Sequence, residues 1–208
     1  FPTRRSSDLD TDFGAVATDS KHKSVAGVKT GYGELEGFFG GGRAAGSAVG
    51  VYYNDFSTAH HSDDYSNQFS ADDLWGAYLK GNLGKWTALA NYEHVSLKDG
   101  VKNINKDDNA DVWIGKLSYG KANFATPKSW DAWLEYINAE DGAFIGANSN
   151  SWRFSNDMDN ITSWGVGADY TFAKNAMFQV MQSFGSKTKD GNAEDPEEQT
   201  RAQFVFVF

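Results

Sequence analysis

The sequence contains no cysteine, and only three proline and four histidine residues among its 208 positions. The absence of cysteine excludes a disulfide framework, a thiolate zinc site and a cysteine nucleophile. No apolar run approaches the roughly 18–20 residues that a transmembrane helix needs. The chain is therefore either soluble or crosses a membrane with strands, because a β-barrel strand exposes only every second side chain to lipid.

Basic residues are also scarce. The chain has 19 Lys and Arg residues against 28 Asp and Glu residues, which gives a formal net charge of −9. This balance provides no basic stripe that could neutralise phosphates, so we expect no nucleic-acid partner.

Period-two alternation, the pattern of a strand with two different faces, is abundant. It predicts seven strands, at 72–81, 85–96, 110–120, 128–138, 161–172, 175–186 and 200–208. A less regular pattern predicts further strands at 11–18, 24–32, 33–42 and 46–55, with GYGE at 31–34 as a tight turn. No segment has a sustained helical stripe.

The predicted connections differ in length. Short ones lie at 82–84, 120–127 and 173–175, and long polar ones lie at 97–109, 139–160 and 186–199. Long and short connections alternate, so one end of the sheet is elaborated and the other is plain. This is typical of outer-membrane barrels, which have long extracellular loops and short periplasmic turns.

Four of these strands contain a Trp and a Tyr six residues apart, far more than seven Trp and nine Tyr would give by chance in 208 residues. Because six is even, both rings of a pair point to the same face, about 20 Å apart along the strand. Two such rows predict the aromatic girdles of a membrane barrel. The predicted girdle residues are Trp86, Tyr92, Trp113, Tyr119, Trp130, Tyr136, Trp164 and Tyr170, together with Phe178 and Phe184, which repeat the spacing.

The two faces of these strands differ in chemistry. Between the paired aromatics the residues on the same face are small or apolar, for example Ala88 and Ala90, with Gln182 between Phe178 and Phe184 as an exception. The opposite face is mostly polar, with charges of both signs, as in the lumen of a channel. The predicted channel-lining residues are Lys80, Asn91, Glu93, Lys116, Ser118, Asp131, Glu135, Asp169, Gln179, Arg201 and Gln203. Their acidic members slightly outnumber the basic ones, which predicts at most a mild preference for cations.

A soluble β-sandwich or barrel with the aromatic face inside is the alternative. Such a core usually places large aliphatic residues between its aromatics, and these are sparse here. Small residues between two aromatic rows favour a surface in contact with lipid.

The C-terminal sequence adds a resemblance to a known class. Phe204, Phe206 and the terminal Phe208 resemble the assembly signal of bacterial outer-membrane proteins. The segments SWGVGADYTFAKNAMFQVMQSFGSK and EEQTRAQFVFVF are similar to the closing hairpin of porins from didermic Firmicutes, which carry an N-terminal S-layer-homology domain. The resemblance implies location in the outer membrane, contact with its lipid and lipopolysaccharide, and insertion by the barrel-assembly machinery. It also implies a homotrimer and, through the upstream domain, contact with a cell-wall polymer.

We therefore expect an all-β fold, an antiparallel up-and-down transmembrane β-barrel. About 10–11 strands of about 16 would be present, so that the sheet is expected to be open or artificially closed near residues 10–55. The first nine residues, FPTRRSSDL, resemble the translation of a sequencing-library adapter, and we exclude them from the fold. Residues 10–208 then form the C-terminal part of one barrel domain, and the natural N-terminus lies upstream.

The sequence offers no case for catalysis, for a metal site or for a cofactor. His60 and His61 with Asp63 and Asp64 are interpreted as a solvated loop. His94 shares the outward parity of Tyr92, which favours an interfacial role over that of a catalytic base.

The expected function is passive diffusion of small hydrophilic solutes and ions through a water-filled channel. One alternative is a structural barrel that tethers the membrane to the cell wall through an upstream domain. The other alternative is a soluble β-rich carbohydrate-binding module.

Overall fold

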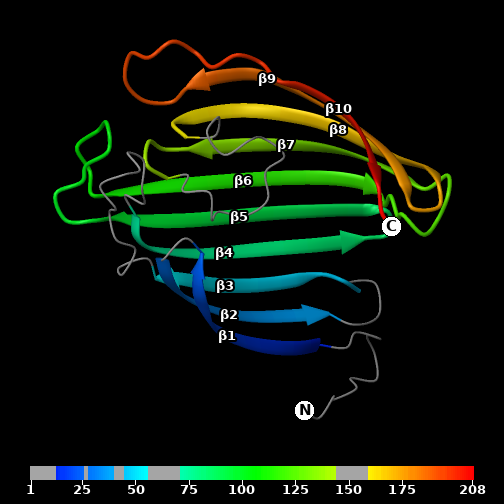
Figure 1. The fold of residues 1–208 in the computed structure, drawn as a ribbon, viewed down its shortest axis with the longest axis horizontal. Coiled ribbons are helices and arrows are strands. Elements are labelled where there is room, and N and C mark those ends of the chain that lie inside the picture. Colours follow the sequence, from blue (N-terminus) through cyan, green and yellow to red (C-terminus); the bar gives the residue numbers. More distant parts are fainter. Residues whose placement is uncertain (1–12, 26–27, 40–44, 56–70, 144–158) are drawn as a thin grey trace.

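The computed structural model describes residues 13–25, 28–39, 45–55, 71–143 and 159–208. These residues form ten strands in a single sheet (Figure 1). The strands are β1 (Phe13–Val25), β2 (Val28–Phe39), β3 (Ala48–Asp55), β4 (Ala71–Leu83), β5 (Trp86–Leu97), β6 (Asn109–Gly120), β7 (Trp130–Ala139), β8 (Ile161–Ala173), β9 (Ala176–Thr188) and β10 (Thr200–Phe206).

Every strand pairs antiparallel with its neighbours in sequence, from β1 through β10. Figure 1 shows this order for β1 at the bottom of the view to β9 at the top, while β10, in red, overlaps β8 and β9 in this view. Within the described residues no ladder joins β1 to β10, so the sheet is open and these two strands are its edges. The predicted all-β, antiparallel, up-and-down fold class is confirmed.

The seven strands predicted from residue 72 onward, and the one predicted at 46–55, correspond to β3 through β10 with ends that move by a few residues. Their alternation was unambiguous because one face is apolar and the other polar. The prediction upstream was wrong. Two long strands, β1 and β2, replace the three that were expected at 11–18, 24–32 and 33–42.

The supposed tight turn GYGE lies inside β2. Gly31 pairs with Lys21 of β1 on one side and with Asp55 of β3 on the other. The β1–β2 ladder instead extends to Val25 and Val28, which are partners in it. Two glycines close together do not by themselves indicate a turn. Within a strand, glycine is also typical of a site that another side chain or backbone approaches closely.

The connections divide the sheet into two ends. Residues 98–108, 140–160 and 189–199 connect strands at one end, here called the long-connection end, at the left of Figure 1. Residues 84–85, 121–129 and 174–175 connect strands at the opposite, short-connection end. The tightest turns use Gly84 and Asn175 with positive φ angles of 62° and 63°, a conformation that these two residue types adopt at little cost.

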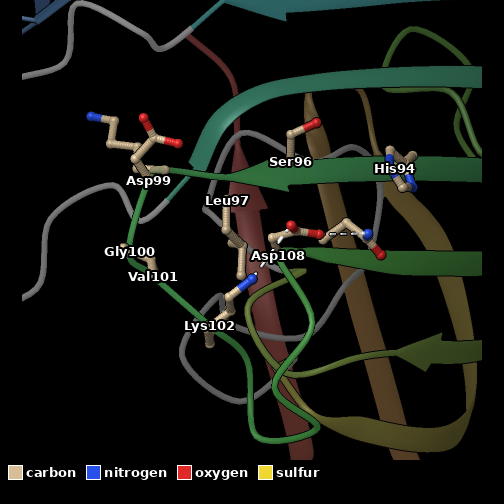
Figure 2. A pocket seen from close by; sticks show the side chains of 10 residues that line it. His94, Ser96, Leu97, Asp99, Gly100, Val101, Lys102 and Asp108 are labelled. Atoms are coloured by element: carbon tan, nitrogen blue, oxygen red, sulfur yellow. Dashed lines mark hydrogen bonds and ion pairs between the residues drawn. The ribbon is translucent and has the colours of Figure 1, made fainter.

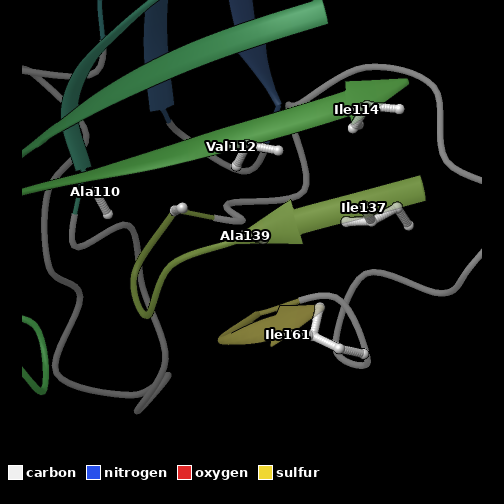
Figure 3. Close-up of a cluster of buried hydrophobic side chains, with 7 residues drawn as sticks. Ala110, Val112, Ile114, Ile137, Ala139 and Ile161 are labelled. Atoms are coloured by element: carbon white, nitrogen blue, oxygen red, sulfur yellow. The ribbon is translucent and has the colours of Figure 1, made fainter. Parts of the chain in front are cut away.

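One face of the sheet is exposed and the other is buried; we call them the outer face and the inner face. Along β5 the exposed Trp86, Ala88 and Ala90 alternate with less exposed residues, and Glu93 and Val95 are fully buried. Apolar residues gather on the inner face near the long-connection end in two clusters. The first, drawn in Figure 3, comprises Ala110, Val112, Ile114, Ile137, Ala139, Ala143 and Ile161. The second comprises Ala71, Leu74, Val95 and Leu97.

Candidate functional site

An aromatic row crosses six strands of the outer face near the short-connection end; we call it the short-end row. Trp86 contacts Tyr119 edge-on with ring centroids 4.8 Å apart, and Tyr119 lies 5.8 Å from Trp130. Strand register continues the row from Trp130 to Tyr170 and on to the closing hairpin. Its members are Trp86, Tyr119, Trp130, Tyr170, Phe178 and Phe204.

A second row lies toward the long-connection end, here the long-end row. Tyr92 lies 4.3 Å from Trp113 and 5.2 Å from Trp75, centroid to centroid. Trp164 lies 4.7 Å from Tyr136 and stacks on Phe184 at 6.4 Å. Its members are Trp75, Tyr92, Trp113, Tyr136, Trp164 and Phe184. The predicted aromatic residues therefore all lie on the outer face, in two rows.

Two contributors to these rows were missed from the sequence. Trp75 has glycine, not an aromatic residue, six positions later, so the pair spacing did not detect it. Phe172 packs edge-on against both Phe204 and Phe206, with centroid distances of 5.8 and 6.2 Å. It follows Tyr170 on the outer face, and strand parity alone would have placed it there.

The surface between the rows is exposed and almost entirely apolar, with Gln182 of β9 as a polar residue within it. Leu117 is 44% exposed, Leu134 39% and Val166 44%. Within the described parts of β4 to β9, no charged side chain lies on the outer face between the two rows. Monomeric soluble proteins rarely expose contiguous apolar patches of more than a few hundred Å². This band therefore requires an apolar environment or a partner.

No helix in the described parts of the chain is long and apolar enough to cross a membrane.

All of the predicted channel-lining residues lie on the inner face. Strand register aligns Asp131 with Asp169, Asp169 with Gln179, and Gln179 with Gln203 in one row across four strands. Gln203 donates from Nε2 to Gln179 Oε1 at 2.5 Å and accepts from Arg201 Nη2 at 2.6 Å. Acidic, amide and guanidinium side chains therefore lie together on the inner face between the aromatic rows.

One ion pair of the inner face is partly buried. Lys116 Nζ lies 3.6 Å from Glu135 Oε2, and the Glu135 side chain is fully buried. The same ammonium lies 4.3 Å from the ring centroid of Trp133, a cation–π contact. The Lys116 ammonium thus contacts both the Glu135 carboxylate and the Trp133 ring. The sequence predicted only that Glu135 lines the channel, and did not predict its burial.

Aromatic rings on the inner face lie across glycines of the neighbouring strand. A Cβ atom on Gly76 would stand 2.3 Å from Tyr52, and one on Gly50 would stand 2.4 Å from Tyr78. Each tyrosine thereby reaches a carboxylate one strand farther on: Tyr52 donates to Glu93, and Tyr78 donates to Glu36. Trp133 crosses Gly167 in the same way. Sequence reasoning missed these crossings, because nothing in the local pattern links residues on next-but-one strands.

On β5 and β6 the polarity of the two faces changes at the long-end row. Beyond this row the outer face carries polar residues such as His94 and Asp111, while the inner face carries Val95 and Val112, both fully buried. The predicted channel-lining residues lie between the two rows or directly beside them, so the residues farther along the strands lie outside that prediction. On β5 and β6 the strands continue past the row with polar residues on the outward parity.

The chemistry available for catalysis or metal binding is sparse. Among the described residues no group of three or more His, Asp or Glu side chains could hold a metal ion. His94 Nδ1 lies 2.7 Å from Asp111 Oδ1 on the outer face. The segment with His60, His61, Asp63 and Asp64 lies outside the described residues, as do residues 1–9.

The C-terminal aromatic residues lie on the outer face of the edge strand β10. Phe204 is 65% exposed and Phe206 55% exposed, and Phe208 lies just beyond the strand. Phe204 packs on Phe178 at 5.0 Å between centroids. The backbone N–H of Val207 donates to the Asn175 carbonyl at 3.0 Å, which ties the chain end to the β8–β9 turn.

No model of a known protein family matches the chain, and no curated protein is significantly similar to it in sequence.

Proposed function

We propose that this chain is part of an outer-membrane porin, whose outer face contacts lipid and whose inner face lines a water-filled channel for small hydrophilic solutes and ions. The reversal of polarity at the long-end row is the observation that supports it best. On β5 and β6 the outer face is apolar short of the row, whereas beyond it His94 and Asp111 face outward and Val95 and Val112 face inward. A change of solvent along the outer face, from lipid to water, accounts for the change from apolar to polar residues on that face.

The dimensions of the outer face support the same assignment. Paired aromatics six residues apart lie about 20 Å apart along a strand, or about 15 Å along the membrane normal at a tilt near 40°. Rings inclined toward the headgroups then bracket most of an apolar band about 25 Å tall. Trp and Tyr suit these positions because each has an apolar ring and one polar group that stays hydrated.

The inner face between the rows supports passage of hydrophilic solutes. It combines lysine, arginine, aspartate, glutamate and amide side chains, and Lys80 is exposed to solvent. Selectivity in such channels depends on the charges of the wall. The acidic side chains slightly outnumber the basic ones, so we expect a weak preference for cations.

Two measurements test the proposal. Quenching of tryptophan fluorescence by brominated lipids reports contact of the outer face with hydrocarbon, and strong quenching is expected. Single-channel recording in planar bilayers reports conduction, and the reversal potential reports its ion preference. A chain that stays in the aqueous phase without detergent, with unquenched tryptophan fluorescence, would contradict the membrane assignment. Quenching without conductance would contradict the channel alone.

A further inference from the structure

The connections at the two ends of the sheet differ in charge. The short connections at 84–85, 121–129 and 174–175 contain four lysines and no acidic residue. The long connections at 98–108, 140–160 and 189–199 contain twelve acidic residues and five basic ones. We call the four lysines of the short connections the basic rim: Lys85, Lys121, Lys128 and Lys174. The proposed channel does not use these residues.

The basic rim carries positive charge that no nearby carboxylate neutralises. All four lysines are exposed, and none of them forms an ion pair within the described parts of the chain. Asp131 contacts the 121–129 connection, but its Oδ2 accepts from the backbone N–H of Ala122 at 2.8 Å. The ammonium groups are therefore available to an external anion.

Two lysines at the opposite end of the sheet are paired. Figure 2 shows Lys102 beside Asp108 at the wall of a pocket, with Lys102 Nζ 3.4 Å from Asp108 Oδ2. Lys189 Nζ lies 2.9 Å from Glu140 Oε1. A carboxylate at this distance offsets much of the lysine's charge, so an external anion gains less at these lysines than at the basic rim.

Backbone hydrogen bonds hold the basic rim in place. The Lys85 carbonyl accepts from the N–H of Gly120, at the end of β6, at 2.8 Å. The Lys128 N–H donates to the carbonyl of Thr171, near the end of β8, at 2.7 Å. The four lysines therefore follow the consecutive ends of β5, β6, β7 and β8, and adjacent strands lie about 4.8 Å apart.

The basic rim lies directly outside the aromatic residues of the outer face. Each lysine is one or two residues away from one of these aromatics, which are, in the same order, Trp86, Tyr119, Trp130 and Phe172. The Lys85 ammonium lies 5.9 Å from the Tyr119 ring centroid. Two residues span about 7 Å of extended chain, or about 5 Å along the membrane normal at a tilt near 40°. If the short-end row marks the edge of the hydrocarbon, the rim lies in the headgroup layer.

We propose that the basic rim binds the headgroups of anionic phospholipids. This inference rests on the proposed function, in which the short connections face the periplasm and the phospholipid leaflet, whereas the long connections face lipopolysaccharide. A lysine ammonium has three N–H donors and no acceptor, and it binds phosphate as a compact point charge. A zwitterionic headgroup also carries its own cation, which a lysine without an acidic neighbour repels. Lipids with a net negative charge are therefore preferred.

Quenching of tryptophan fluorescence by brominated lipids, in vesicles that contain the full chain, measures this preference at each row. One variant keeps Trp86 and Trp130 beside the basic rim, a second keeps Trp113 and Trp164 of the long-end row, and phenylalanine replaces the other tryptophans in each. At Trp86 and Trp130 we expect brominated phosphatidylglycerol to bind about fivefold more tightly than brominated phosphatidylcholine, which corresponds to about 1 kcal/mol for a lysine beside an anionic leaflet. In about 1 M salt, where the Debye length is about 3 Å, the preference should nearly vanish. No such preference is expected at the long-end row.

Substitution of all four lysines of the basic rim by glutamine is expected to abolish the preference at Trp86 and Trp130. Lys128→Gln and Lys106→Gln form a matched pair, because both lysines are exposed and have positive φ angles, of 69° and 72°. Lys128→Gln should lower the preference, whereas Lys106→Gln, in the 98–108 connection, should leave it unchanged. Unchanged heat-modifiable migration shows that each variant is folded.

Equal binding of the two lipids at Trp86 and Trp130, an equal preference at both rows, or a preference that survives loss of the four lysines would overturn the inference. Suppression of the preference by inorganic phosphate at constant ionic strength would identify free phosphate as the ligand. Suppression by soluble polyphosphate alone would identify an acidic polymer, and either result would overturn the lipid as partner. Quenching by both lipids without a preference refutes this inference alone, whereas absent quenching refutes the proposed function as well.

Discussion

Tyr52 of β3 lies across Gly76 of β4 and donates its hydroxyl hydrogen bond to Glu93 of β5. One side chain thereby joins three strands on the inner face. The crossing is possible only because residue 76 has no Cβ atom, since that atom would stand 2.3 Å from the tyrosine ring.

Substitution Gly76→Ala tests this crossing. We expect it to lower the free energy of unfolding by about 1–3 kcal/mol, because the ring must move and overpacking is costly. Urea unfolding from phospholipid vesicles, followed by fluorescence, measures the change. Gly115→Ala is the matched control, since that glycine lies on the outer face with no atom within 4 Å of an added Cβ. Equal stability of the two variants would show that the crossing contributes nothing.

A charge placed on the outer face tests the lipid contact. Leu117→Arg is expected to lower the free energy of unfolding by about 2–4 kcal/mol in vesicles, the cost of arginine near the bilayer midplane. Ser118→Arg, one residue later on the inner face, should cost much less. An equal cost for the two variants would contradict the assignment of the faces.

A double-mutant cycle tests the inner-face ion pair. Lys116→Met removes the ammonium 3.6 Å from the buried Glu135 carboxylate and is expected to cost about 3 kcal/mol. Adding Glu135→Gln should recover much of this loss, because the buried charge is then absent. The same unfolding assay measures the coupling. Strictly additive effects would mean that the pair does not interact energetically.

Deletion of the terminal phenylalanine tests whether Phe208 acts in assembly in the cell or in the stability of the folded chain. Deletion of Phe208 is expected to reduce the fraction of heat-modifiable protein in outer-membrane fractions, because the resemblance assigns this residue to the assembly signal. Refolding of the same variant into vesicles should be nearly normal, because the Phe208 side chain is fully exposed. Undiminished insertion in cells would contradict the assignment.

The Lys102–Asp108 pair predicts a pH dependence. Lys102 lowers the pKa of Asp108 in the folded chain, so the stabilisation is present above the pKa of the unfolded chain and is lost as pH falls through the folded value. Lys102→Ala should raise the Asp108 pKa toward its ordinary range, which carboxyl carbon NMR would record. Lys85→Ala should leave it unchanged. A pKa that does not move in Lys102→Ala would assign the shift to another cause.

Strands β3 to β10 could be predicted from the sequence because one of their faces is apolar and the other polar, so period-two alternation locates them. The same parity placed Trp86 and Tyr119 on one face before any contact was known. Within β1 and β2 the alternation is weak and glycines are frequent, and the supposed GYGE turn proved to be mid-strand. The residues next to a glycine do not show whether it lies in a turn or beneath a side chain of the neighbouring strand.

The amino-acid sequence by itself determined the antiparallel meander, its alternating connections and the two aromatic rows, because each depends on spacing along a single strand. Only the tertiary structure decided which residues meet across strands. The contact of Tyr52 with Glu93 and the burial of Glu135 beside Lys116 both depend on register between strands. Register is set by the sheet as a whole, through ladders and crossings between residues far apart in the chain.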